Sequence, residues 1–144
     1  MQKIDQQLDI ARGLMQSGLP GAAQMDQTEI DNYLQPFLAS GQLVIGTAKR
    51  GDDTEHFGFA LWAKVSDETD AALKAGRIDV RESGLAGLEA GENAWIVDLV
   101  CPVALADAFL TSTTAAIFPD KLVMASLRDK DGDARCIIAQ QTPN

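Results

Sequence analysis

Hydrophobic and polar residues follow a helical spacing in the N-terminal part of the chain. Apolar residues recur every three or four positions over residues 3–16, which predicts a helix there that ends at a cluster of Ser, Gly and Pro. A second helix is expected to begin at Asp26 or Thr28, because Glu29 follows Asp26 at the spacing of a capping box. Pro36 is expected to break or turn this second helix, since proline lacks the amide that a helix interior requires.

The spacing then changes to that of β-strands, and the rest of the chain alternates strands with helices. The charged stretch at residues 49–55 is expected to be the turn of an antiparallel hairpin, and residues 77–93, which contain several glycines, are expected to be a loop. The predicted strands are residues 42–48, 57–63, 94–101, 121–128 and 134–139, and the predicted helices between them are residues 67–75 and 104–117. This order of elements predicts one α+β domain over residues 1–144, with a largely antiparallel central sheet flanked by helices.

A single carboxylate interrupts the most apolar of these strands. Residues 94–102 contain Trp, Ile, Val and Leu, which suit a covered sheet, and Asp98 lies near the middle of the run. Because a buried aspartate needs a partner, Asp98 either caps a turn at the strand end, is held by structural hydrogen bonds, or takes part in chemistry. The two cysteines, Cys101 and Cys136, also lie in apolar runs, and we interpret them as reduced core thiols and not as a disulfide.

Charge and composition narrow the classes of protein that fit. A net charge of −9 argues against nucleic acid or an anionic membrane surface as the main partner, since both require a cationic face. No apolar run approaches the roughly 20 residues of a membrane-spanning helix. The first residues lack the basic and apolar regions of a signal peptide, so we expect a cytoplasmic protein. One histidine and two separated cysteines give no zinc pattern, so no metal is expected.

Three patterns suggest specific chemistry but fit a structural interpretation better. The aspartates at alternate positions of residues 129–133 begin like a calcium loop, but Ala134 and Gln140 stand where such a loop has Gly and Glu, which favours a hairpin turn. The glycines of residues 84–87 follow no strand, so they do not form a nucleotide-binding loop. His56 is the one imidazole and hence the default general base near neutral pH, although a surface histidine is the more common case.

Four blocks of the sequence occur in the order of a known family. The most specific block, residues 91–102, has the pattern glycine, acid, two variable residues, tryptophan, two apolar residues, aspartate, variable, apolar, variable, proline. The other blocks are a proline and apolar residues leading into a Gln-led strand at residues 36–45, a Trp-Ala strand before a Ser-x-Glu helix start at residues 58–68, and Phe-Pro-Asp-Lys-Leu at residues 118–122. Together they resemble the RTX toxin-activating lysine acyltransferases, the family of the hemolysin-activating acyltransferase, over residues 8–140.

The resemblance implies a fold and a reaction. Members of that bacterial family have a fold like the GNAT acyltransferases but use neither coenzyme A nor a metal. They take a fatty acyl group from acyl carrier protein and place it on the ε-amine of internal lysines in an RTX protoxin, with a histidine and an aspartate as catalytic residues. Asp98 matches the aspartate, and a carboxylate in that role orients the histidine ring and stabilises its charged form. The resemblance therefore implies acyl carrier protein and an RTX protoxin as partners, and no cofactor. A homodimer is compatible with the sequence, which contains no pattern that shows one.

The sequence departs from that family at the histidine. Aligning the prolines puts Ala22 at the position of the catalytic histidine. One hypothesis is a divergent acyltransferase in which His56 or Cys101 takes over the lost role, which predicts an open cleft that gathers Asp98 with a base. The alternative is a catalytically silent homologue that acts as a binding or regulatory module, which predicts an Asp98 satisfied by backbone amides with no base within reach.

Acyl carrier protein is acidic, so a chain with a net charge of −9 also requires a local basic patch to bind it.

Overall fold

A computed structural model describes residues 2–17, 25–128 and 134–141. The helices are α1 (Gln2–Met15), α2 (Gln27–Ala39), α3 (Asp67–Lys74), α4 (Val80–Ser83) and α5 (Val103–Ile117), with a short 3-10 helix η1 (Leu85–Gly87) after α4. The strands are β1 (Leu43–Arg50), β2 (Asp53–Val65), β3 (Asn93–Val100), β4 (Val123–Arg128) and β5 (Ala134–Gln140). Outside the first hairpin, the strand boundaries fall within two residues of the predicted ones.

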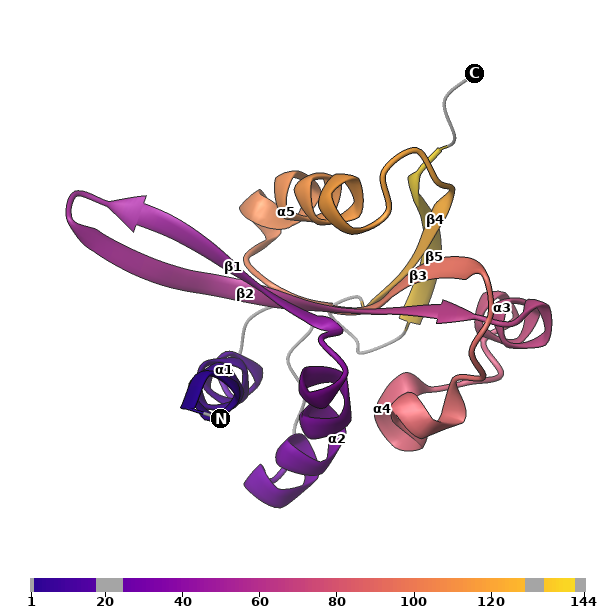
Figure 1. The fold of residues 1–144 in the computed structure, drawn as a ribbon, viewed down its shortest axis with the longest axis horizontal. Coiled ribbons are helices and arrows are strands. Elements are labelled where there is room, and N and C mark those ends of the chain that lie inside the picture. Colours follow the sequence, from indigo (N-terminus) through magenta and orange to yellow (C-terminus); the bar gives the residue numbers. More distant parts are fainter. Residues whose placement is uncertain (1, 18–24, 129–133, 142–144) are drawn as a thin grey trace.

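The five strands form one sheet in the order β1-β2-β3-β4-β5. Neighbouring strands are antiparallel except β3 and β4, which run parallel because the chain returns along the sheet face through α5. Figure 1 shows α1 and α2 on one face of this sheet and α5 on the other. The predicted α+β class, with a largely antiparallel sheet flanked by helices, is therefore confirmed.

Each face of the sheet carries its own hydrophobic core. Successive side chains of β2 point to opposite faces, so Phe59 and Leu61 join the core of α1 and α2, whereas Ala60 joins the core of α5. We call the core against α1 and α2 the first core. The largest buried side chain, Trp95, lies in it and donates its indole N–H to Asp70 at 2.8 Å. Because helices cover both faces of the central strands, β3 is apolar at almost every position.

Helix α2 begins as predicted but continues further than predicted. Asp26 is its N-cap, and the capping box is complete, with the Asp26 carboxylate accepting the Glu29 amide at 2.8 Å. The expected break near Pro36 is wrong, because the helix continues past this residue. Pro36 is exposed while the next residue, Phe37, is buried, so packing of the last turn outweighs the loss of one helical hydrogen bond.

The first hairpin is longer than predicted. β1 and β2 stay paired out to Arg50 and Asp53, so the turn consists of Gly51 and Asp52 alone and the expected turn over residues 49–55 is wrong. Gly51 has a φ of 61°, a left-handed conformation that glycine adopts without strain. The outer half of the hairpin is exposed and projects away from the helices (Figure 1), so it forms an arm.

The segment between α3 and β3 is more regular than predicted. Residues 77–93, expected to be a loop, contain α4 and η1. The Asp79 side chain caps α4, and Gly84 ends it with a φ of 67°. Val80 of this short helix is buried in the first core, which anchors α4 against the sheet.

Two sequence-based predictions concern residues outside the described ranges, namely Ala22 at the histidine position and the aspartate-rich turn at residues 129–133. Within the described ranges, every helix is too short or too polar to cross a membrane. In this same part of the chain, no group of three or more His, Cys, Asp or Glu side chains is placed to hold a metal ion.

Candidate functional site

A β-bulge in β3 determines the direction in which Asp98 points. Leu61 of β2 pairs with Asp98, and the next residue, Trp62, pairs with Ile96, so Val97 is an extra residue on β3. Simple alternation would place Asp98 on the same face as Ile96, toward α5. The bulge instead turns Asp98 toward α2 and α4, and bulges beside functional sites commonly redirect a side chain in this way.

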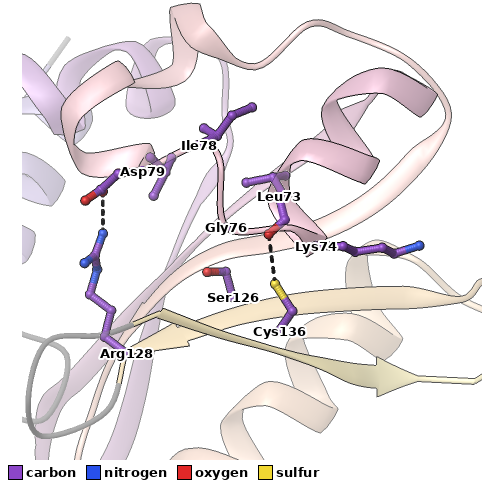
Figure 2. A pocket seen from close by; sticks show the side chains of 9 residues that line it. Leu73, Lys74, Gly76, Ile78, Asp79, Ser126, Arg128 and Cys136 are labelled. Atoms are coloured by element: carbon purple, nitrogen blue, oxygen red, sulfur yellow. Dashed lines mark hydrogen bonds and ion pairs between the residues drawn. The ribbon is translucent and has the colours of Figure 1, made fainter.

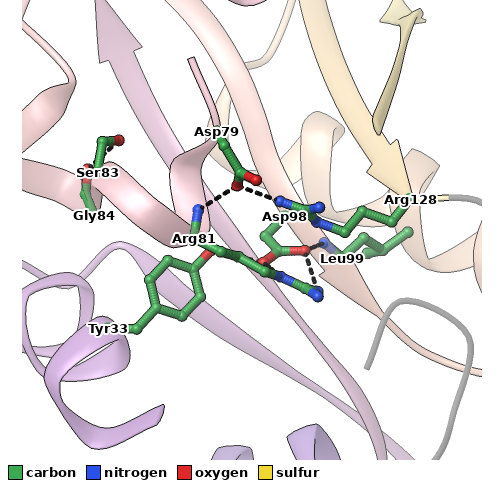
Figure 3. A network of polar contacts seen from close by, with 8 residues as sticks. All are labelled: Tyr33, Asp79, Arg81, Ser83, Gly84, Asp98, Leu99 and Arg128. Carbon is green, nitrogen blue, oxygen red and sulfur yellow. Dashed lines mark hydrogen bonds and ion pairs between the residues drawn. The ribbon is translucent and has the colours of Figure 1, made fainter. Parts of the chain in front are cut away.

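The Asp98 carboxylate is buried, with the residue 1% exposed, and accepts hydrogen bonds at both oxygens (Figure 3). Oδ2 accepts hydrogen bonds from Tyr33 Oη at 2.6 Å and from Arg81 Nε at 2.9 Å. Oδ1 accepts hydrogen bonds from Arg81 Nη2 at 3.0 Å and from the Leu99 amide at 2.9 Å. Because a carboxylate has about four lone-pair positions, these contacts occupy all of them.

A second ion pair fixes the helix that carries Arg81. The Asp79 carboxylate accepts a hydrogen bond from the Arg81 amide at 3.0 Å, and this contact caps α4. It also accepts a hydrogen bond from Arg128 Nη2 at 2.6 Å (Figure 3). Arg128 is the last residue of β4, so this contact fastens α4 to a strand beyond β3. Helix α4 thus supplies the cation that neutralises Asp98.

Burial and charge decide the ionisation of the groups around Asp98. Burial raises the pKa of Tyr33 well above its usual range, and the Asp98 charge raises it further. Burial acts to lower the pKa of Arg81, but the Asp98 charge and hydrogen bonds outweigh burial and leave this pKa raised. Tyr33 therefore stays protonated and Arg81 stays charged at neutral pH, so neither acts as a general base there.

The structure separates Asp98 from His56 and does not activate Cys101. His56 is exposed on the arm, five positions from the Asp98 partner Leu61, which corresponds to roughly 16 Å along the strand. Cys101 is closer but buried, and burial raises the pKa of its thiol, the opposite of what a nucleophile needs. Among the described residues, no histidine, lysine or cysteine contacts the Asp98 carboxylate.

Sequence reasoning identified Asp98 but not the groups that hold it. The hypothesis of a silent homologue predicted satisfaction by backbone amides, whereas the Leu99 amide is one contact and the side chains of Tyr33 and Arg81 supply the others. A buried carboxylate needs a cationic partner. The sequence contains 12 lysines and arginines, and Arg81 lies in a segment expected to be a loop, so the sequence does not single it out as that partner.

An apolar pocket opens where the parallel strands separate. β3 and β4 pair over Ala94–Ile96 and Val123–Ala125, although both strands continue beyond this point. We call the space beyond the paired residues the strand-divergence pocket. It has a volume of about 140 Å³ and is lined by Leu99, Cys101, Val103, Ala106, Leu127 and Arg128. Apart from Arg128 the lining is apolar, and one of its residues, Leu99, follows Asp98 in β3 and donates its backbone amide to the Asp98 carboxylate.

A second pocket lies on the opposite face of β4, against α3 and α4 (Figure 2). It has a volume of about 200 Å³ and is lined by Leu73, Lys74, Gly76, Ile78, Asp79, Val80, Ser126, Arg128 and Cys136. Its lining mixes charged, hydroxyl and apolar groups, and the Cys136 thiol donates to the Leu73 carbonyl at 3.2 Å. Arg128 borders both pockets, but the strand-divergence pocket offers the more continuous apolar surface.

Fold and site together define a small α+β protein with a buried, ion-paired aspartate that faces α2 and α4, and with an apolar pocket between two diverging parallel strands that is lined by the next residue of β3 and by α5. Comparison with known proteins places it more closely. The model of the RTX toxin acyltransferase family matches residues 14–141, and the chain belongs to this family. It is also 29% identical over 103 residues to an uncharacterised protein of Synechocystis sp., a match that covers 72% of this chain and 67% of that protein. The predicted family is therefore confirmed.

Proposed function

We propose that this protein binds a fatty acyl group presented by acyl carrier protein, without the histidine–aspartate chemistry implied by the family resemblance. Membership of the RTX toxin acyltransferase family supports an acyl donor as the ligand. The strand-divergence pocket carries the proposal, because it offers a concave apolar surface at the strand end that bears Asp98. Each methylene group buried there contributes about 0.8 kcal/mol to binding.

In this proposal Asp98 is a positioning residue. For its carboxylate to engage a base, a hydrogen bond from Arg81 or Tyr33 must be given up, and the released group stays buried without its partner. Breaking a buried ion pair in this way costs about 3–5 kcal/mol. The carboxylate instead fixes α4 and the end of β3, and it holds the pocket wall at Leu99 through that residue's amide.

Arg128 is the group that we expect to contact the polar end of the donor. It is the one charged residue in the described lining of the strand-divergence pocket, and guanidinium N–H groups bind carbonyl and phosphate oxygens well. Since the net charge of −9 opposes an acidic carrier at long range, burial of the acyl chain is expected to dominate the affinity.

Equilibrium binding of acylated and unacylated carrier protein tests the proposal. We expect the acylated carrier to bind at least about tenfold tighter, a gain that corresponds to roughly two buried methylene groups. Leu127→Asp places a charge in the pocket and should remove this preference. Ile138→Asp, the same change at an exposed position of β5, should leave it intact. Equal affinity of wild type for both carriers would refute the proposal.

The family match favours a second candidate function, transfer of the bound acyl group to the ε-amine of an internal lysine of an RTX protoxin. Incubation with acyl carrier protein and protoxin, followed by intact mass, detects transfer as a loss from the carrier and an equal gain on the protoxin. If wild type transfers the group, the protein is an enzyme and its base lies elsewhere. If Ala22→His transfers it and wild type does not, the scaffold is intact and donor binding is the function.

A further inference from the structure

The size of the strand-divergence pocket limits what it holds. Its volume is about 140 Å³, below the roughly 300–1,000 Å³ of sites for drug-sized ligands. An engineered apolar cavity of about 150 Å³ holds one benzene molecule, a ring of six carbon atoms. A hydrocarbon segment of similar size therefore fills this pocket, and a longer chain extends out of it.

The wall of the pocket at Cys101 cannot easily yield to a longer chain. Cys101 is fixed from behind by β2, because a Cβ built on Gly58 would lie 2.5 Å from the Cys101 Cβ and 2.4 Å from the Val100 carbonyl oxygen. The backbone of β2 thus contacts Cys101 directly. Any atoms added to the Cys101 side chain must extend into the pocket.

We propose that the protein selects acyl groups of about six to eight carbons, with Cys101 and Leu127 as the residues that set this length. The inference rests on the proposed function and adds the class of acyl group to it. Cys101 limits the pocket from the end of β3, and Leu127 limits it from β4. Together with Leu99 they determine how many carbons are removed from water.

Binding of an acyl series measures this length directly. The probes are carrier proteins loaded with butanoyl, hexanoyl, octanoyl, dodecanoyl and hexadecanoyl groups, and the matching free carboxylates. Affinity should rise about fourfold for each added carbon until the pocket is full. Beyond hexanoyl or octanoyl the gain should fall below about twofold per carbon, since further carbons stay largely in water.

We call the chain length beyond which the affinity gain per carbon falls the break. Two substitutions should move this break in opposite directions. Cys101→Met adds two non-hydrogen atoms to the wall and should shorten the preferred chain by about two carbons. Leu127→Ala removes three carbons and should lengthen it by about two to three. Cys136→Met is the matched control, since Cys136 lines the pocket on the opposite face of β4 and should leave the break unchanged. Circular dichroism confirms that each variant is folded, and either folded variant suffices for the test.

The outcomes separate the inference from the proposed function. An affinity that rises without a break to hexadecanoyl, or a break that neither pocket variant moves, would overturn the length selection while donor binding stands. A movable break seen with the free carboxylates but no binding of any acyl carrier supports the pocket and refutes the carrier as donor. Failure of every chain to bind in either form would overturn both.

Discussion

Asp98 is held by groups that lie far apart in the sequence. Tyr33 reaches it from α2, Arg81 reaches it from α4, and the β3 bulge turns the carboxylate toward both of them. The resulting network is almost closed to water, since the Arg81 side chain is 9% exposed. A buried ion pair of this kind stabilises a fold little in itself, but removal of one partner is costly because the other charge stays buried.

Asp98→Ala should therefore destabilise the protein severely. We expect the free energy of unfolding to fall by about 3–5 kcal/mol, since Arg81 would remain buried without a carboxylate. Glu55→Ala is the control, because it also removes an arginine-paired carboxylate, but from a pair in which Arg50 is 79% and Glu55 51% exposed, and its loss should be below about 1 kcal/mol. Urea unfolding measures both, and equal losses for the two variants would contradict the account.

Tyr33 should make stability depend on pH in the alkaline range. Its pKa is raised in the folded state, so the folded protein keeps the phenolic proton where the unfolded chain, with a pKa of about 10, has lost it. The stabilisation by Tyr33 is therefore complete below about pH 10 and is lost as pH rises above that value toward the folded-state pKa.

Absorbance of tyrosinate measures this ionisation directly, because the chain contains one tyrosine. We expect the titration of the folded protein to begin above that of free tyrosine and to coincide with unfolding. In Tyr33→Phe the alkaline loss of stability should be smaller, and the variant should be about 1.5–3 kcal/mol less stable at neutral pH. A folded protein that titrates like free tyrosine would show that the phenol is not buried against Asp98.

At the scale of elements, local sequence decides where helices begin, and tertiary packing decides where they end. The capping box of α2 was predictable from Asp26 and Glu29 alone. The continuation of that helix past Pro36 depends on burial of Phe37 in a core built mostly from later parts of the chain. Helix α4 is only four residues long and is held by Val80 and by contacts of Asp79 and Arg81, so its short sequence gives no helical period to detect.

Asp26→Ala tests the cap of α2. The Glu29 amide would lose its acceptor, and the free energy of unfolding should fall by about 1 kcal/mol. Thr28→Ala is the control, because Thr28 was the alternative candidate for the cap but lies inside the helix and is exposed. Chemical denaturation of both variants should show the loss for Asp26→Ala alone. A larger loss in Thr28→Ala would place the start of the helix elsewhere.

The arm formed by β1 and β2 should be separable from the chemistry of the site. His56 is exposed there and far from Asp98, so His56→Ala should change the free energy of unfolding by less than about 0.5 kcal/mol. Its affinity for acylated carrier protein should equal that of wild type. A loss of binding in a stable His56→Ala variant would bring the arm into the site and contradict the separation.

For the whole molecule, the sequence predicted the α+β class, the number of strands and their succession with helices along the chain, and the importance of Asp98, because each depends on local pattern or on one unusual residue. It could not predict that β3 bulges at Val97 or that β4 leaves β3 after Ala125, since both are matters of register between distant segments. These two features create the site, one by directing Asp98 toward Arg81 and the other by opening the pocket.

The dependence of acyl discharge on Asp98 distinguishes a positioning role of this residue from a catalytic one. Wild type and Asp98→Asn, at a temperature where both are folded, are incubated with acyl carrier protein at saturating concentration, and the carrier is followed by intact mass. If Asp98 is a positioning residue, both proteins leave the acyl group on the carrier at the same slow background rate. Discharge by wild type that folded Asp98→Asn lacks would show that Asp98 performs catalysis and would contradict the positioning role proposed for it.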